Sequence, residues 1–233
     1  MLLITRPLEK AKALAEVLHN HHIPTVISPV MDIEYLPLAF CDHPFAVIMT
    51  SAHAIPAFNH LSLNPQHVFL VGSKNQHDLI YEGPCHMSPH GYRGLLPLLK
   101  KYIDDHQYVL YLSGDHITFD FESFFKKNFN HILFKRILCY KAHAIRSLSE
   151  KAYEAFQANH IRGVTFFSRR SVDLFYHMAH SFKNHFSSYK AYCTSKAIGD
   201  VAKKHGFCSV YISPTPTLGN LIQLIRETYY DPL

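Results

Sequence analysis

The sequence predicts an α/β protein built from two similar parallel-sheet domains. Short apolar segments of strand length alternate with segments whose apolar residues recur every three or four positions, as in amphipathic helices. Most of the strand-like segments end in a hydroxyl residue or a glycine, and the order of the elements recurs in the second half of the chain. Such alternation is typical of parallel sheets that carry helices on both faces.

The strand-like segments are short and rich in aliphatic and aromatic residues. They comprise residues 2–4, 25–27, 45–49, 68–71, 109–112, 132–140, 164–167, 189–193 and 210–212. Helical spacing predicts helices over residues 11–18, 121–128, 171–179, 196–205 and the segment after Thr217 through Arg226. Gly206 is a typical stop after a helix. Because ligands of parallel α/β sheets bind at the carboxyl ends of the strands, the residues there are the candidates for a site.

An internal repetition indicates two related domains. Residues 3–7 and the helix after them resemble residues 110–114 and their helix, and residues 46–54 resemble 163–171. The pattern alone places a domain boundary near Asp105. If strands of the first half instead pair with strands of the second, each domain would contain segments from both halves. Periodicity does not decide between these two arrangements.

Composition excludes several classes of protein. The 233 residues are 48% hydrophobic, which suffices for a core, and the longest apolar runs fall far short of the ~20 residues of a membrane-spanning helix. The first residues show no signal-peptide pattern. Five cysteines are scattered and never spaced Cys-x-x-Cys, which favours free thiols in a reducing compartment. We therefore expect a cytoplasmic protein that has no membrane partner.

The charge balance favours an anionic small molecule over nucleic acid. Lys and Arg number 23 and Asp and Glu 18, so the net charge is +5. The cations lie in scattered pairs such as Lys135-Arg136, which are typical of solvated surfaces. A nucleic-acid interface would show a continuous basic stripe with interleaved aromatic residues, which the sequence lacks.

Polar residues at the predicted strand ends are the candidate binding residues. They are Thr5, Thr50 and Ser51, Gly72 and Ser73, Ser113 and Gly114, Ser168, and Thr194 and Ser195. A helix N-terminus offers free N–H groups and a positive dipole end, and so binds anions. Each residue by itself is equally an ordinary N-cap, worth about 1 kcal/mol. Their repetition in two domains predicts an anion-binding cleft.

The patterns of cofactor, metal and triad enzymes are missing. No dinucleotide-binding or P-loop motif occurs, and no Gly-x-Ser-x-Gly motif occurs. The densest histidine groups lack carboxylate or thiolate partners at a metal-site spacing; they are His177, His180 and His185, and Cys85, His86 and His90. We expect no cofactor and no metal.

Tyr140 ends a predicted strand near the middle of the chain. A phenol with a pKa of about 10 stays protonated at neutral pH, so it donates a proton or a hydrogen bond while uncharged. Taken alone, this residue is equally a half-buried strand tyrosine.

Several motifs, in order along the whole chain, resemble the uroporphyrinogen-III synthase family. The matching segments are residues 3–7, 50–54, 71–73, 110–115, 139–140, 166–168, 194–198 and 213–222. The resemblance implies two flavodoxin-like α/β domains joined by a two-stranded linker, with a cleft between them. The first domain would comprise residues 1–36 plus 141–233, and the second residues 37–140.

The resemblance also implies a reaction. The family closes the linear tetrapyrrole hydroxymethylbilane to uroporphyrinogen III, with inversion of ring D and loss of water, and uses no cofactor or metal. The tyrosine at the position of Tyr140 is the favoured acid. We therefore expect a monomeric lyase of heme biosynthesis. Its expected substrate-binding residues are Thr5, Arg6, Ser51, Ser73, Ser113, Ser168, Arg169, Thr194 and Ser195.

Two points stay open at this level. Arg169 and Arg170 follow a strand end, where they would either bind carboxylates or face solvent. A two-lobed module that binds a polyanionic ligand without turnover would use the same residues.

Overall fold

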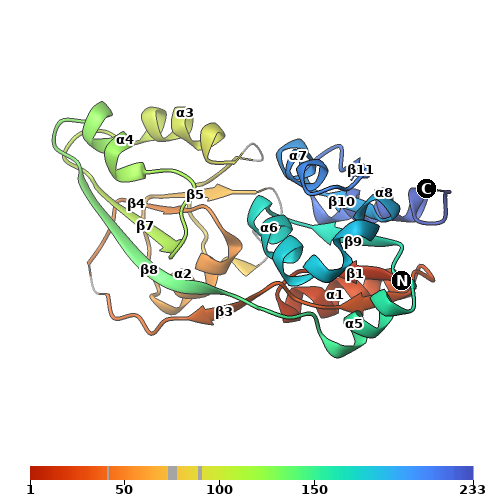
Figure 1. The fold of residues 1–233 in the computed structure, drawn as a ribbon. Helices are drawn as coiled ribbons and strands as arrows, with labels where there is room; N and C mark the ends of the chain where they lie inside the picture. The colour runs from red at the N-terminus through yellow and green to blue at the C-terminus, as the bar shows by residue number, and fades with distance from the viewer. Residues whose placement is uncertain (41, 73–77, 89–90, 233) are drawn as a thin grey trace. The chain divides into compact units, whose positions relative to one another are not determined.

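The computed structural model describes residues 1–40, 42–72, 78–88 and 91–232, and the chain forms two compact units (Figure 1). The discontinuous unit comprises Met1–Asp32 and His143–Leu233, and the continuous unit comprises Ile33–Ala142. The boundary near Asp105 suggested by the repeated pattern is wrong, because Asp105 lies inside the continuous unit. The domain boundaries expected from the resemblance, after residues 36 and 140, stay a prediction.

The discontinuous unit contains a five-stranded sheet in which all strands run parallel. Its strands are β1 (Leu2–Ile4), β2 (Thr25–Ile27), β9 (Gly163–Phe166), β10 (Lys190–Cys193) and β11 (Ser209–Ile212). The spatial order is β2-β1-β9-β10-β11. Within this unit that is order 2-1-3-4-5, the flavodoxin-like order, whose switch point lies between β1 and β9.

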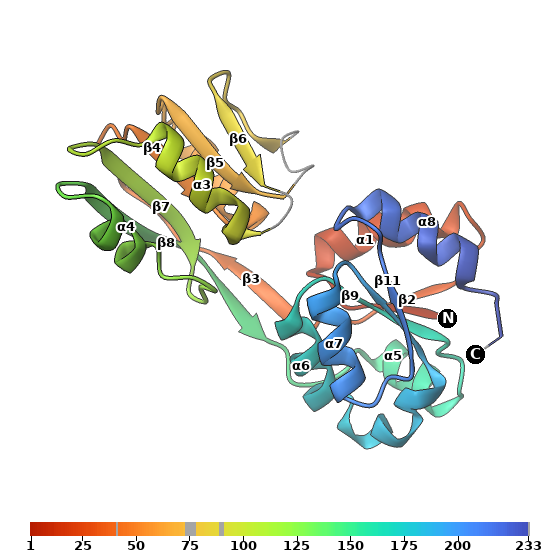
Figure 2. The same ribbon diagram turned by 90° about the horizontal axis from the view of Figure 1, so that it is seen from above.

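Helices cover both faces of this sheet (Figure 2). On one face lie α1 (Leu8–His19) and α8 (Leu218–Thr228). On the other lie α5 (Glu150–Gln157), α6 (Arg169–Met178), α7 (Lys196–Lys204) and the 3-10 helix η3 (His180–Ser188). Helix α1 packs on the sheet through its apolar side. Leu14 and Leu18 lie four positions apart on that side, and both are buried against Leu2 and Ile4 of β1.

The continuous unit contains a six-stranded sheet of order β3-β8-β7-β4-β5-β6. Its strands are β3 (Met31–Tyr35), β4 (Ala46–Met49), β5 (His67–Val71), β6 (Cys85–Ser88), β7 (Tyr108–Gly114) and β8 (Leu133–Ala144). Strands β4 to β8 pair in parallel, and the chain crosses between the units through β3 and β8. The order reverses between β4 and β7, which makes their carboxyl ends the switch point of this sheet.

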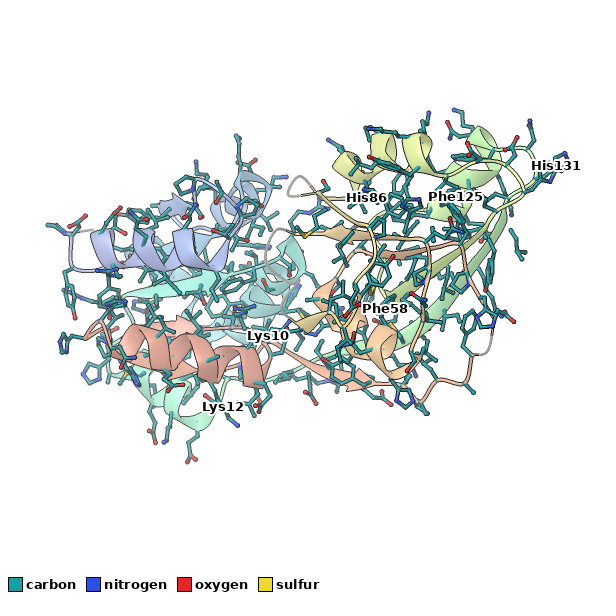
Figure 3. All side chains as sticks on the ribbon, turned by 180° about the vertical axis from the view of Figure 1, so that it is seen from behind. Lys10, Lys12, Phe58, His86, Phe125 and His131 are labelled. Carbon is teal, nitrogen blue, oxygen red and sulfur yellow. The ribbon has the colours of Figure 1, made fainter. Side chains whose placement is uncertain are left out.

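The core of the continuous unit lies on both faces of its sheet. The short helices η1 (Ala52–Ala54) and α2 (Ile55–His60) cover one face, and α3 (Tyr92–Tyr102) and α4 (Phe121–Asn128) cover the other. Phe58 of α2 and Phe125 of α4, labelled in Figure 3, are both buried and belong to the two different cores. The expected α/β fold with two parallel sheets is confirmed.

Two elements escaped the sequence pattern. Strand β6 reads Cys-His-Met-Ser and lacks the β-branched residues that predict a strand. Helix α3 contains Gly94 and Pro97, which normally argue against a helix interior. Its buried Leu95 and Leu99, four positions apart, stabilise it through tertiary packing instead.

Candidate functional site

The switch point of the continuous unit brings together three segments that are distant in sequence. β4 and β7 run side by side in parallel, with Met49 opposite Leu112, and β8 runs beside β7. The carboxyl ends of β4 and β7 therefore lie at one edge of the sheet, and Tyr140 of β8 is paired with Gly114 at that edge. Ser51, Gly114 and Tyr140 thus come from three neighbouring strands.

A bulge in β8 aims Tyr140. Ser113 pairs with Leu138 and Gly114 pairs with Tyr140, so Cys139 is the extra residue of the ladder. Successive side chains of a regular strand point to opposite faces, but a bulge shifts that alternation by one residue. Cys139 and Tyr140 accordingly both pack in the core on the α2 face. Without the bulge, the Tyr140 ring would point to the α3 and α4 face.

The ring of Tyr140 lies directly on the backbone of Gly114. Tyr140 is buried, and a Cβ on Gly114 would stand 2.5 Å from ring atoms Cε2 and Cζ and 2.8 Å from the phenolic oxygen. Such distances are far below van der Waals contact. Only glycine leaves room for the ring at this position.

The phenol of Tyr140 is held neutral. Burial raises its pKa above the usual value, and a hydrogen bond with the Ser51 side chain offsets part of that shift. Electrostatic interactions with the neighbouring Cys139, Tyr111 and Asp115 raise the pKa further. The residue is therefore a protonated donor at neutral pH, as general acid catalysis requires.

His53 contacts Tyr140 and the residues around it. Its ring centroid lies 5.5 Å from that of Tyr140, and its backbone N–H donates to Ser51 Oγ over 3.3 Å. The imidazole Nδ1 is 3.4 Å from the hydroxyl of Tyr35 on β3. Ser51 is thus the cap of η1 and at the same time the partner of the phenol.

Arg136 holds the end of β7 and was missed at the level of sequence. Its Nε donates to Ser113 Oγ over 2.8 Å, and its Nη2 donates to the Gly114 carbonyl over 2.8 Å. Lys135 and Arg136 are both exposed, as expected for a solvated pair, and Lys135 pairs with Asp42 at the surface; Arg136 in addition bonds the end of β7. The sequence feature that could have indicated a role for Arg136 is its position four residues before Tyr140 on the same strand.

In the discontinuous unit, several expected binding hydroxyls are already engaged within the fold. The buried Thr5 hydroxyl donates to the Thr165 carbonyl over 2.6 Å. Ser168 forms a reciprocal capping box with Ser171 at the start of α6. Both lie at the carboxyl edge beside the switch point of β1 and β9. The Ser168 backbone N–H donates to Ser171 Oγ over 3.1 Å, so both the hydroxyl and the N–H of Ser168 are already bonded within the fold.

The two arginines of this edge differ. Arg6 follows β1 and stacks on Phe167, with the guanidinium carbon 4.3 Å from the ring centroid. Burial lowers its pKa to about 10, and no opposite charge contributes to that shift. Arg169, in the first turn of α6, is exposed. A partly buried guanidinium that has no acidic partner among the described residues is suited to a carboxylate.

The remaining candidates follow β10 and β5. Thr194 is buried and its N–H donates to the Phe166 carbonyl, while Ser195 occupies the cap position of α7 with no side-chain cap bond. Thr194 and Ser195 thus lie at the same edge as Thr5 and Ser168. Ser73 lies outside the described residues.

The described residues contain neither a metal-binding group nor a membrane-spanning helix. Within residues 1–40, 42–72, 78–88 and 91–232, His, Cys, Asp and Glu side chains form no group of three that could hold a metal ion. Over the same residues, each helix is too short or too polar to cross a bilayer.

Fold and site together define a two-unit α/β protein with a buried tyrosine at the switch point of one sheet. The family model for uroporphyrinogen-III synthase HemD matches residues 12–223. The chain therefore belongs to the uroporphyrinogen-III synthase family, which makes it a cyclising lyase of tetrapyrrole and heme biosynthesis. Hydroxymethylbilane is the substrate that the family implies.

Solved structures agree on the fold. A mutant uroporphyrinogen III synthase from Thermus thermophilus is 14% identical with a TM-score of 0.60, and the match covers 97% of this chain and 98% of that one. A uroporphyrinogen-III synthetase from Helicobacter pylori is 15% identical with a TM-score of 0.59, at the same coverage of 97% and 98%. No curated protein sequence matches significantly.

Proposed function

We propose that this protein closes hydroxymethylbilane to uroporphyrinogen III, with inversion of ring D, and that Tyr140 protonates the departing hydroxyl. The observation that carries the role of Tyr140 is its buried, neutral phenol at the switch point, hydrogen-bonded to Ser51 and packed on Gly114. Such a phenol already carries the proton that it would donate at neutral pH.

The proton balance of the proposed step closes. Tyr140 donates its proton as the bond between carbon and hydroxyl breaks, so that water leaves and an azafulvenium cation remains on the bilane. The substituted carbon of ring D attacks that cation, and the bond from this carbon to the bridge toward ring C then breaks. The unsubstituted carbon of ring D bonds to the freed bridge carbon and loses its proton, which restores the phenol. The cation also closes spontaneously without inversion, so the protein must above all hold ring D in place.

The substrate carries eight carboxylates, and we propose that the strand-end residues of both units bind them. These are Thr5, Arg6, Ser51, Ser73, Ser113, Ser168, Arg169, Thr194 and Ser195. Arg6 is the best supported, because its guanidinium is partly buried and its pKa is depressed by desolvation alone. The helix N-termini after Ser168 and Ser195 would contribute backbone N–H donors.

The isomer composition of the product tests this proposal. Purified protein is given freshly generated hydroxymethylbilane, and the products are oxidised and separated as porphyrin isomers. The synthase yields isomer III in excess over a reaction without protein. A module that only binds the polyanion would yield isomer I alone, the product of spontaneous closure.

We also infer a cytoplasmic monomer. Support comes from the thiols: of the described cysteines, Cys85, Cys139, Cys193 and Cys208 are all free. Free thiols are typical of a reducing compartment. Light scattering of the purified protein measures the mass, for which the monomer predicts 26.8 kDa.

A further inference from the structure

We propose that Arg136 is the positioning residue of Tyr140, a role that rests on the function proposed above. In the described part of the chain, Arg136 makes no hydrogen bond and no cation–π contact with Tyr140. It acts through the segment Ser113–Asp115, which it holds from one side and on which the phenol rests from the other.

Arg136 binds the end of β7 through two hydrogen bonds. Two donors of one rigid guanidinium engage Ser113 Oγ and the Gly114 carbonyl, each over 2.8 Å, and Nη2 lies 3.4 Å from the Asp115 carbonyl. A planar fork with two anchoring bonds fixes direction as well as distance. Lysine carries the same charge but lacks this geometry.

Gly114 is in direct contact with Tyr140. The phenol packs so closely on the Gly114 backbone that no Cβ would fit between them. A movement of Gly114 therefore either displaces the ring or removes its support. The Asp115 carboxylate accepts the N–H of Ala142 over 3.2 Å, which ties the same segment to β8 just beyond the bulge. Arg136 and Asp115 therefore brace the bulge that aims Tyr140.

Tyr111 is a further neighbour of the Tyr140 phenol. Tyr111 of β7 shares a hydrogen bond of 2.9 Å with Thr50, the residue before Ser51. Burial raises the pKa of Tyr111, and the hydrogen bond with Thr50 and the positive charge of Arg136 offset part of that shift. The charge of Arg136 therefore also acts on Tyr111, whose hydroxyl is bonded to the residue before Ser51.

The experiment compares Arg136→Met with Lys135→Met as matched control. Lys135 precedes Arg136 on the same strand, and its exposed ion pair with Asp42 has no part in the site. Both proteins are labelled with 3-fluorotyrosine, and the Tyr140 signal among the 14 tyrosines is identified by its loss in Tyr140→Phe. We expect Arg136→Met to shift or broaden that signal and Lys135→Met to leave it in place.

Kinetics supplies the second readout. In Arg136→Met we expect kcat to fall at least about tenfold while KM stays within about twofold, because the proton donor is misplaced and substrate binding is not. Arg136→Lys serves the same comparison if the methionine variant does not fold. Ser113→Ala, which removes one of the two anchoring acceptors, should likewise shift the Tyr140 signal, by less than Arg136→Met does.

Three results would overturn the proposal: an unmoved Tyr140 signal, a moved signal with unchanged kcat, or a raised KM with unchanged kcat, which would make Arg136 a substrate-binding residue. Failure of the proposed function looks different. If Tyr140→Phe keeps full turnover, Tyr140 is not the acid, and a signal that still moves only in Arg136→Met confirms the positioning of the ring alone.

Discussion

Gly114 and Tyr140 form a steric pair across neighbouring strands: the phenol occupies the space in which any other residue at position 114 would place its Cβ. The glycine is required by the ring and not by its own backbone, since its φ is not among the positive values of the chain. This relationship makes an ordinary strand-end glycine part of the candidate site.

Gly114→Ala should displace the Tyr140 ring. We expect kcat to fall and the free energy of unfolding to drop by about 1–3 kcal/mol, the usual cost of overpacking. Urea denaturation in a double-mutant cycle with Tyr140→Ala measures the coupling. An equal cost of Gly114→Ala with and without the ring would contradict the steric explanation.

Tyr140→Phe keeps the ring on Gly114 but removes the donor. Turnover should fall about 10²- to 10⁴-fold, the range of general acid catalysis, while the fold and KM change little. Stopped assays of hydroxymethylbilane consumption, corrected for spontaneous closure, give kcat. Unchanged turnover would exclude Tyr140 as the acid. Its raised pKa also predicts that no loss of activity from phenol ionisation appears below the ordinary tyrosine value.

Arg6→Met should weaken substrate binding without destabilising the protein. The guanidinium is desolvated, which depresses its pKa to about 10, and it stacks on the Phe167 ring. Loss of one charge-assisted contact to a carboxylate predicts about a ten- to hundredfold rise in KM. The melting temperature should stay the same or rise. An unchanged KM together with a lower melting temperature would assign Arg6 a purely structural role.

Lys190 anchors the C-terminal helix of the discontinuous unit. It is buried in β10, and its Nζ donates to the carbonyls of Thr228, Tyr229 and Asp231. Lys190→Met leaves these acceptors unpaired and should cost about 2–4 kcal/mol of unfolding free energy. Chemical denaturation measures it, with exposed Lys203→Met as control. Equal stabilities of the two variants would refute the anchoring role.

Stability should fall at alkaline pH. Burial raises the pKa of Tyr229 to about 12 and that of the Cys193 thiol to about 12, from ordinary values of 10.0 and 9.0. Between those values the unfolded chain has lost protons that the folded chain keeps, so rising pH favours unfolding. The stabilities at pH 7 and 8 should agree, and the decline should begin near pH 9.

Tyr229→Phe isolates one share of that decline. The buried Tyr229 hydroxyl has no hydrogen-bond partner among the described residues, so its removal should cost nothing at pH 7. Denaturation midpoints between pH 8 and 11 should fall less steeply in Tyr229→Phe than in the unmodified protein. Parallel pH profiles would mean that Tyr229 ionises equally in both states.

Much of the site was accessible from the strand ends. Ser51, Ser113 and Tyr140 were predicted, since polar residues directly after apolar strands are a local signal, and the structure brings them to one sheet edge. Arg136 was missed because its meaning depends on a partner 22 residues away in sequence. Thr5 and Ser168 were predicted as substrate-binding residues, which stays a prediction; the structure adds that their hydroxyls are bonded within the fold, which no local pattern shows.

The sequence by itself determined the alternation of strands and helices, and with it the fold class, because periodicity and capping residues act over a few neighbouring positions. Only the tertiary structure decided that β1 lies between β2 and β9 and that the bulge at Cys139 turns Tyr140 toward Ser51. Both depend on which strands pair and in which register. Pairing between strands more than a hundred residues apart is set by the burial of whole sheet faces, which no single segment of the chain encodes.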